Sequence, residues 1–106
     1  MSKSDLEDLF AFQLDACGLT GYARQYRAIK GRKFAFDFAF LDARLLIEIQ
    51  GGTYSNGAHA RPLGIARDYE KSNLAQLAGW RCLAFDGKAV RSGEAIEFVR
   101  KALGKK

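Results

Sequence analysis

The sequence predicts an α/β fold, with helices on both faces of one mixed sheet. Two adjacent runs, residues 33–40 and 44–50, alternate in hydrophobic character with a period of two, as neighbouring strands do. Helix-like and strand-like runs follow in the order α-β-β-β-α-β-α, in which the last strand is reached through a helical crossover. At 106 residues, the chain is predicted to be a single domain, 1–106, with a modest core.

The first half of the chain contains a helix, a weak strand and a hairpin. Residues Ser4–Glu7 have the form of a capping box, which predicts that a helix begins there, and Gly18 is predicted to end it. An arginine-rich strand is expected over 22–28. The two strongly alternating runs come next, and the link between them is short enough only for a hairpin.

The second half alternates between helix and strand. A polar loop over 53–64 precedes a helix over 65–78 and a short strand over 81–85. Ser92 is predicted to cap a final helix that runs through Leu103. On the helix over 65–78, the residues expected to face the core are Ala66, Tyr69, Leu74, Leu77 and Ala78.

The hairpin is predicted to bring two acidic residues together. If Asp42 and Ala43 form its turn, counting back along both strands places Asp37 directly opposite Glu48. Opposed side chains on one face of a sheet lie about 4.5–5.5 Å apart at Cβ, where two like charges repel each other. A fold keeps such a pair when a positive charge lies between them, and a divalent cation is the natural candidate. The alternative is that Asp37 faces solvent on an open sheet.

Composition and charge favour a protein with a polyanionic partner. The net charge is +5, and the residues that we expect to contact nucleic acid are Arg24, Arg27, Lys30, Arg32, Lys33, Arg61 and Arg67.

No run of about 18 apolar residues and no signal peptide are present, so we expect a cytoplasmic protein without a membrane partner. Cys17 and Cys82 are far apart and lack the spacing of a zinc site.

The positions of the acidic residues resemble those of the PD-(D/E)XK nuclease superfamily. An acidic helix is followed by Asp37 on one hairpin strand and by Glu48-Ile49-Gln50 on the next. The chain is similar to the small very-short-patch-repair endonuclease-like and Holliday-junction resolvase-like branches in a downstream pattern of Gly51-Gly52, His59, Asp68-x-x-Lys71-x-Asn73 and Gly79 to Phe85. This resemblance implies a restriction-endonuclease-like α-β-β-β-α-β core with a C-terminal helix.

The resemblance also implies a metal site. Asp37 would be the central ligand of a Mg²⁺ ion, for which Mn²⁺ can substitute, and Glu48 with the Ile49 carbonyl oxygen would complete the set. Glu7 matches an additional acidic residue that many members carry on the first helix; otherwise Glu7 closes the capping box of that helix. Carboxylate and carbonyl oxygens suit Mg²⁺ or Mn²⁺ better than soft metals, and no organic cofactor is expected.

Gln50 departs from the family pattern. It stands where the family usually has a lysine that orients or activates the attacking water, whereas a glutamine can only form hydrogen bonds. Lys71 on the following helix is a candidate for the missing amine, unless it only pairs with Asp68. His59 is a candidate proton donor to the leaving group, or an ordinary histidine of an exposed loop.

The expected function is that of a metal-dependent DNA endonuclease. The small size favours selection by DNA structure (branches, nicks or mismatches) and a phage setting. The resemblance to the Holliday-junction resolvases implies a role in DNA repair or recombination and a possible homodimer. Gln50 keeps open a catalytically weak or inactive nucleic-acid-binding module of the same fold. An RNA-directed nuclease of the same fold is the other alternative.

Overall fold

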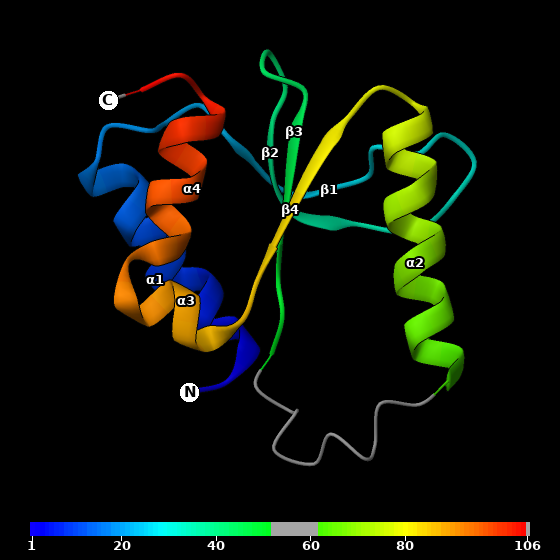
Figure 1. Cartoon of the computed structure of the whole chain (residues 1–106), viewed down its shortest axis with the longest axis horizontal. Coiled ribbons are helices and arrows are strands. Elements are labelled where there is room, and N and C mark those ends of the chain that lie inside the picture. The colour runs from blue at the N-terminus through cyan, green and yellow to red at the C-terminus, as the bar shows by residue number, and fades with distance from the viewer. Residues whose placement is uncertain (52–61, 106) are drawn as a thin grey trace.

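Helices cover both faces of a four-stranded sheet in the computed structural model of this protein (Figure 1). The structure describes residues 1–51 and 62–105, and for residues 62–68 it describes the backbone alone. The elements are, in order, α1 (Lys3–Ala16), β1 (Ala23–Tyr26), β2 (Phe36–Phe40), β3 (Leu45–Ile49), α2 (Pro62–Leu77), β4 (Arg81–Phe85), α3 (Gly87–Ser92) and α4 (Glu94–Ala102). The predicted α/β class is confirmed, and the C-terminal part contains two helices in place of one.

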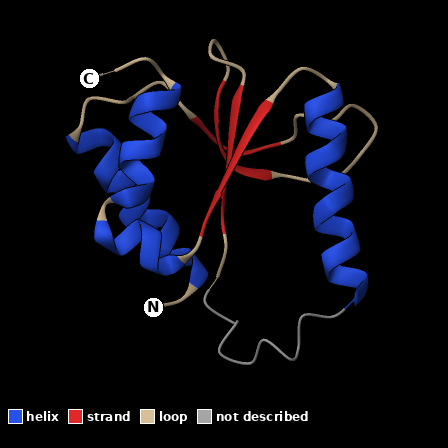
Figure 2. Cartoon of the chain, viewed as in Figure 1, coloured by secondary structure: helices blue, strands red, loops and turns tan. Residues whose placement is uncertain are grey.

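The sheet is mixed, with the strand order β1-β2-β3-β4. The first two pairings are antiparallel and the β3–β4 pairing is parallel, so α2 carries the chain back along the sheet between β3 and β4 (Figure 2). In the hairpin, Phe38 pairs with Ile47 and Phe40 pairs with Leu45. This is the register predicted from the turn at Asp42 and Ala43. The strand predicted over 81–85 is also confirmed.

Two hydrophobic clusters hold the three layers together. The cluster between the sheet and α1, α3 and α4 contains Leu6, Phe10, Leu14, Phe38, Phe40, Ile47, Ile49 and Val99 among its buried residues. The cluster on the α2 face contains Phe36, Ala39, Leu46, Ala75 and Trp80. Full burial of each large apolar side chain contributes roughly 1.5–3 kcal/mol, so both faces of the sheet stabilise the fold. No helix in the described part of the chain is long and apolar enough to cross a membrane.

The first helix begins two residues earlier than predicted. Ser2 is its N-cap, and the Ser2 hydroxyl accepts a hydrogen bond from the Asp5 N–H while the Asp5 carboxylate accepts one from the Ser2 N–H, both at 3.1 Å. The predicted capping box at Ser4–Glu7 is therefore wrong, because Ser2 and Asp5 offer the same spacing one half-turn upstream. Glu7 is left free of the helix cap.

The inward face of α2 also differs from the prediction. Ala75 is buried, whereas Tyr69 is 67% exposed and Leu77 is 85% exposed. The prediction that Tyr69, Leu77 and Ala78 face the core is thus wrong, since Ala78 is also exposed and follows the last residue of α2. Lys71 and Ala75 lie one helical turn apart and face the sheet together, where Lys71 is held by long-range contacts that the helix's own sequence does not reveal.

The C-terminal segment contains a short helix that was not predicted. The Asp86 carboxylate accepts a hydrogen bond of 2.9 Å from the Ala89 N–H and caps α3, which ends at Ser92. Gly93, with φ of 87°, lies in the left-handed region and separates α3 from α4. Ser92 is therefore the last residue of one helix rather than the cap of the next.

Candidate active site

The carboxylates of Asp37 and Glu48 lie where the β2–β3 ladder ends. The Asp37 Oδ2 accepts a hydrogen bond of 2.7 Å from the Ile49 N–H, and the Glu48 Oε1 accepts one of 3.1 Å from the Asp37 N–H. Each carboxylate thereby accepts a hydrogen bond from a backbone N–H of the neighbouring strand. These bonds stand where a further backbone–backbone hydrogen bond would continue the β2–β3 pairing. Asp37 is only 4% exposed and is the buried charged residue of the described chain.

The sequence predicts that the two carboxylates share one face of the sheet, and this prediction is wrong. Asp37 contacts α1, whereas Glu48 contacts α2. The alternation of side chains is broken at Asp37, because Phe36 belongs to the α2-side cluster and Phe38 to the opposite one. On β1, Gln25 lies next to this position with a positive φ of 50°, which accompanies the local distortion.

On the α1 side, Lys3 links Asp37 to Glu7. The Lys3 Nζ lies 2.6 Å from the Glu7 Oε2 and 2.9 Å from the Asp37 Oδ1. The Gln25 side-chain amide joins the same two carboxylates, at 3.1 Å from Glu7 and 3.3 Å from Asp37. Burial lowers the pKa of Lys3, but hydrogen bonds and attraction from Glu7 and Asp37 outweigh it, so the net pKa is raised.

On the α2 side, Lys71 contacts Glu48. Its Nζ donates to the Glu48 Oε2 at 2.8 Å and to the Ala35 carbonyl oxygen at 2.6 Å, and it lies 4.5 Å from the centre of the Phe36 ring. Burial raises the pKa of Glu48, as does the charge of Asp37, while the hydrogen bond from Lys71 lowers it; the net pKa is raised. The sequence-predicted candidates Asp37, Glu48 and Lys71 are thus brought together.

A small pocket of about 120 Å³ opens beside Glu48. Gln50 and Lys71 both line it, so the residue at the family's lysine position and the candidate replacement amine meet at one place. The sequence did not point to two further wall residues, Ser72 and Cys82. Burial raises the pKa of the Cys82 thiol, and so does the nearby charge of Glu48; both favour the protonated thiol over the thiolate.

The donor atoms of this region are suited to a hard divalent cation. Among the described residues, no three His, Cys, Asp or Glu side chains form a group that could hold a metal ion. Mg²⁺ does not require such a group, because it is commonly held by one or two carboxylates and retains several waters. The Asp37 and Glu48 oxygens meet that requirement, and the Lys3 ammonium beside Asp37 shows that the position favours positive charge.

The predicted nucleic-acid contacts fall into two groups. Arg24 and Arg32 are engaged within the protein: Arg24 lies 3.3 Å from Asp8 and 3.8 Å from Glu7, and Arg32 lies 3.0 Å from Glu70. The remaining described candidates are exposed and have no ion pair within the described part of the chain; they are Arg27, Lys30 and Lys33. They lie in or beside the segment that joins β1 to β2.

Three predicted residues cannot be placed. His59 and Arg61 lie outside the described residues, and Arg67 lies in α2 at a position where only the backbone is described. Two residues of the site were not predicted, Lys3 and Gln25. Lys3 precedes Glu7 by four positions, a spacing that favours an ion pair on a helix, but nothing local in the sequence marks Gln25.

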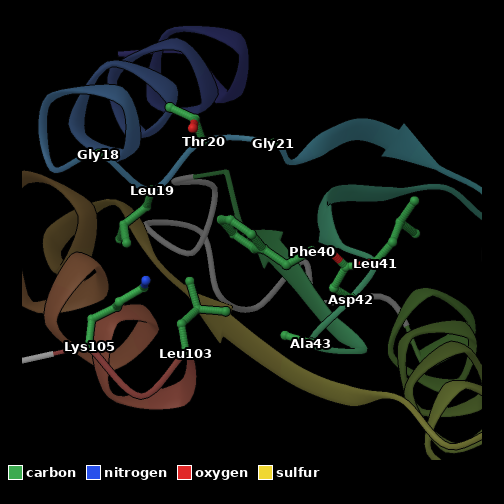
Figure 3. Close-up of a pocket in the computed structure, with 10 residues that line it drawn as sticks. All are labelled: Gly18, Leu19, Thr20, Gly21, Phe40, Leu41, Asp42, Ala43, Leu103 and Lys105. Atoms are coloured by element: carbon green, nitrogen blue, oxygen red, sulfur yellow. The ribbon is translucent and has the colours of Figure 1, made fainter.

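A second pocket, of about 360 Å³, lies at the other end of β2. It is enclosed by the α1–β1 link at Gly18–Gly21, the β2–β3 turn at Phe40–Ala43, and Leu103 with Lys105 near the C-terminus. Figure 3 shows the side chains of Leu19, Phe40 and Leu103 turned toward one another inside it. None of the predicted site residues lines this pocket.

We compared the chain with protein-family models, with curated proteins and with solved structures, and none of these comparisons found a match.

Proposed function

We propose that this protein is a divalent-metal-dependent endonuclease that hydrolyses phosphodiester bonds in DNA, on a restriction-endonuclease-like fold. The observation that carries the proposal is the meeting of Asp37 and Glu48 at the ends of adjacent strands, with the Lys71 ammonium 2.8 Å from Glu48. Two carboxylates and an amine from these three elements are what the resemblance to the PD-(D/E)XK nucleases requires. Branched, nicked or mismatched DNA is the proposed substrate class.

Each residue has a defined part in this proposal. Asp37 and Glu48 would hold Mg²⁺ or Mn²⁺, which when bound polarises the scissile phosphodiester and lowers the pKa of a coordinated water. Lys71 uses two of its three N–H donors on Glu48 and Ala35, and the third is available to the attacking water or to a phosphate oxygen. Gln50 lines the same pocket and can only donate or accept hydrogen bonds.

The proposal is tested by cleavage of a supercoiled plasmid and of a labelled four-way junction with Mg²⁺ or Mn²⁺. We expect cleavage by the native protein, and a loss of at least about 100-fold on addition of EDTA or in Asp37→Asn, since the loss of a charged ligand removes the metal's electrostatic stabilisation. Asp42→Asn, in the exposed β2–β3 turn, is the matched control and should cleave within about twofold of the native rate, as expected of a surface change.

Three results distinguish a wrong site assignment, a loss of fold and a preference for RNA. Cleavage that survives both EDTA and Asp37→Asn would overturn the site assignment. Circular dichroism of Asp37→Asn must match that of the native protein, so that a loss of activity is not a loss of fold. A single-stranded RNA as long as one strand of the junction is assayed in parallel. The RNA-directed alternative predicts that this RNA is cut faster than the junction.

One observation favours a second candidate, a nucleic-acid-binding module that does not cleave. All four oxygens of Asp37 and Glu48 already accept hydrogen bonds, from Lys3, Gln25, Lys71 and two backbone N–H groups. Two carboxylates whose oxygens are all hydrogen-bonded within the protein need no metal ion to be stable. This candidate predicts salt-sensitive binding to the junction with no cleavage under any divalent metal.

A further inference from the structure

The strand β4 forms one edge of the sheet. It pairs with β3 along all five of its residues, from Arg81 opposite Leu45 to Phe85 opposite Ile49. Within residues 1–51 and 62–105, no strand pairs with its other side. Among the described residues, the outer backbone groups of β4 thus have no strand partner.

The hydrogen bonds to β3 show which backbone groups of β4 point outward. The Arg81 N–H donates to the Arg44 carbonyl at 2.8 Å, and the Phe85 carbonyl accepts from the Gln50 N–H at 2.8 Å. Since the bonding direction alternates along a strand, residues 81, 83 and 85 bond to β3, while Cys82 and Ala84 direct their N–H and C=O groups away from it. The edge thus presents two donors and two acceptors in alternation.

The sequence of β4, residues 81–85, lacks the features within a strand that usually prevent strand pairing. Exposed edges in soluble proteins are commonly protected by lysine or proline within the strand, by a bulge, or by a covering element. In β4 the only charge is on Arg81, at the first position, and Cys-Leu-Ala-Phe follows in unbroken register with β3. Ala84, the third residue of this apolar stretch, is exposed.

We infer that this edge pairs with β4 of a second copy of the chain, antiparallel and with a two-fold axis at Leu83. In this register Cys82 of one copy faces Ala84 of the other, and each such pair exchanges both of its outward N–H and C=O groups. Because the two-fold axis generates a second, identical Cys82–Ala84 pair, every outward N–H and C=O group of these residues has a hydrogen-bond partner. Leu83 faces its own symmetry mate as a non-hydrogen-bonded pair, in which the side chains lie closest. A strand that matches itself in this way favours a second copy over an unrelated partner.

The side chains beside the edge favour the same occupant. Leu83, Phe85, Glu94 and the half-exposed Phe98 line a surface pocket of about 380 Å³ on the face that carries α4. Arg81 lies on the same face of β4 as Leu83 and Phe85, because side chains alternate along a strand. In the two-fold register Arg81 of one copy faces Phe85 of the other, next to Glu94 of that copy. In the proposed dimer Arg81, which donates to the Ala43 carbonyl oxygen of its own chain at 3.1 Å, would lie near the opposite charge of Glu94 on both sides of the axis.

Disulfide trapping tests the register directly. Leu83→Cys, in a background of Cys17→Ser and Cys82→Ser, should form a covalent dimer under mild oxidation, because a non-hydrogen-bonded antiparallel pair places its Cα atoms about 4.5 Å apart and a disulfide tolerates roughly 4.4–6.8 Å. Leu77→Cys in the same background is the control, since Leu77 is 85% exposed on α2. We expect at least a tenfold excess of dimer for Leu83→Cys. Equal yields from the two variants, or no dimer from either, would overturn the inference.

Sedimentation of the native protein provides a second, independent test. We expect a mass of two chains for the native protein and for Ala84→Ser, and of one chain for Ala84→Pro. Proline removes the outward N–H at position 84, and it is tolerated on an edge where that N–H faces solvent. A native protein that sediments as a single chain at all concentrations, or an Ala84→Pro variant that remains dimeric, contradicts the inference. If Ala84→Pro does not fold, the trapping experiment still decides the question.

Discussion

At the scale of single residues, the burial of Asp37 is possible because its charge is balanced inside the fold. An unpaired buried carboxylate costs several kcal/mol, and it is tolerated when each oxygen accepts hydrogen bonds. Lys3 and Gln25 bind one oxygen of Asp37, and the Ile49 N–H binds the other. Lys3 thus places a positive charge beside Asp37 from within the chain, next to the carboxylate at which the sequence predicts a divalent cation.

The position of Lys71 leads to a prediction about the missing lysine of the family pattern. Lys71→Met should lower the single-turnover cleavage rate about 100-fold, as expected when one donor at the reacting group is lost, and Gln50→Ala should lower it less than about fivefold. Lys71 is nearly buried and bonded to Glu48, whereas Gln50 is exposed. The measurement is cleavage of the junction at saturating Mg²⁺, with Lys88→Met on α3 as the control. A larger loss in Gln50→Ala than in Lys71→Met would contradict this assignment.

At the scale of the elements, the orientation of α1 and α2 about their own axes places the charged residues at the site. Lys3 and Glu7 lie one turn apart on α1, and both contact the region of Asp37. The N-cap at Ser2 places Lys3 in the first turn, so the start of the helix is coupled to the site. On α2, Lys71 faces the sheet together with Ala75, and this fixes which side of that helix is buried.

The corrected start of α1 can be tested by two serine substitutions. Ser2→Ala should lower the free energy of unfolding by about 1 kcal/mol, because it removes an N-cap acceptor. Ser4→Ala should leave it unchanged or raise it slightly, since Ser4 is exposed inside the helix and alanine is the better helix former. Urea titration followed by circular dichroism measures both values. A larger loss in Ser4→Ala would restore the capping box that the sequence alone suggests.

At the scale of the whole molecule, the exposed basic residues of the β1–β2 segment and the Glu48 pocket lie on the α2 side of the sheet. The segment between β1 and β2 packs there through Ala28 and Ile29, and the Arg32–Glu70 ion pair of 3.0 Å joins it to α2. Lys30 and Lys33, in the same segment, remain exposed. A polyanion lying along this side would reach both the lysines and the pocket.

This charge distribution predicts how binding responds to salt. In Lys30→Ala/Lys33→Ala, the slope of log K against log salt for junction DNA should decrease by about 2, since each phosphate contact contributes roughly 0.9 to that slope. Lys88→Ala/Lys101→Ala removes the same charge from exposed positions on α3 and α4, on the other face, and should change the slope much less. Fluorescence anisotropy in EDTA measures binding without cleavage. Equal changes in the two double variants would show that only net charge matters.

The two proposals together have a geometric consequence. An antiparallel β4 pair has its two-fold axis perpendicular to the sheet, so α2 and the Glu48 pocket of both copies would lie on the same face. At a spacing of about 4.8 Å between strands, the two β3 strands would be roughly 14 Å apart across the pair. Such a dimer would present two sites to one branched DNA molecule.

Local patterns in the sequence were sufficient to identify most of the secondary structure and the register of the hairpin. Alternation identified β2 and β3, and their four-residue link at 41–44 determined that Phe38 pairs with Ile47. These features depend on backbone sterics and on the length of a turn, which neighbouring residues determine. The same count led to Asp37 and Glu48 as the candidate pair. Helix ends were less accurate, because Ser2 and Ser4 both offer the spacing of a capping box.

Only the tertiary structure determined how the candidate site is arranged. Asp37 contacts Lys3, 34 positions away, and Glu48 contacts Lys71, 23 positions away. These contacts decide that the two carboxylates face opposite helices, and they accompany the burial of Ala75 rather than Tyr69 on α2. The strand order, which leaves β4 at one edge of the described sheet, is also a property of the tertiary structure. The physical reason is that a buried charge is placed by whichever partner can neutralise it. That partner comes from a distant element, about which the local period of a strand or helix carries no information.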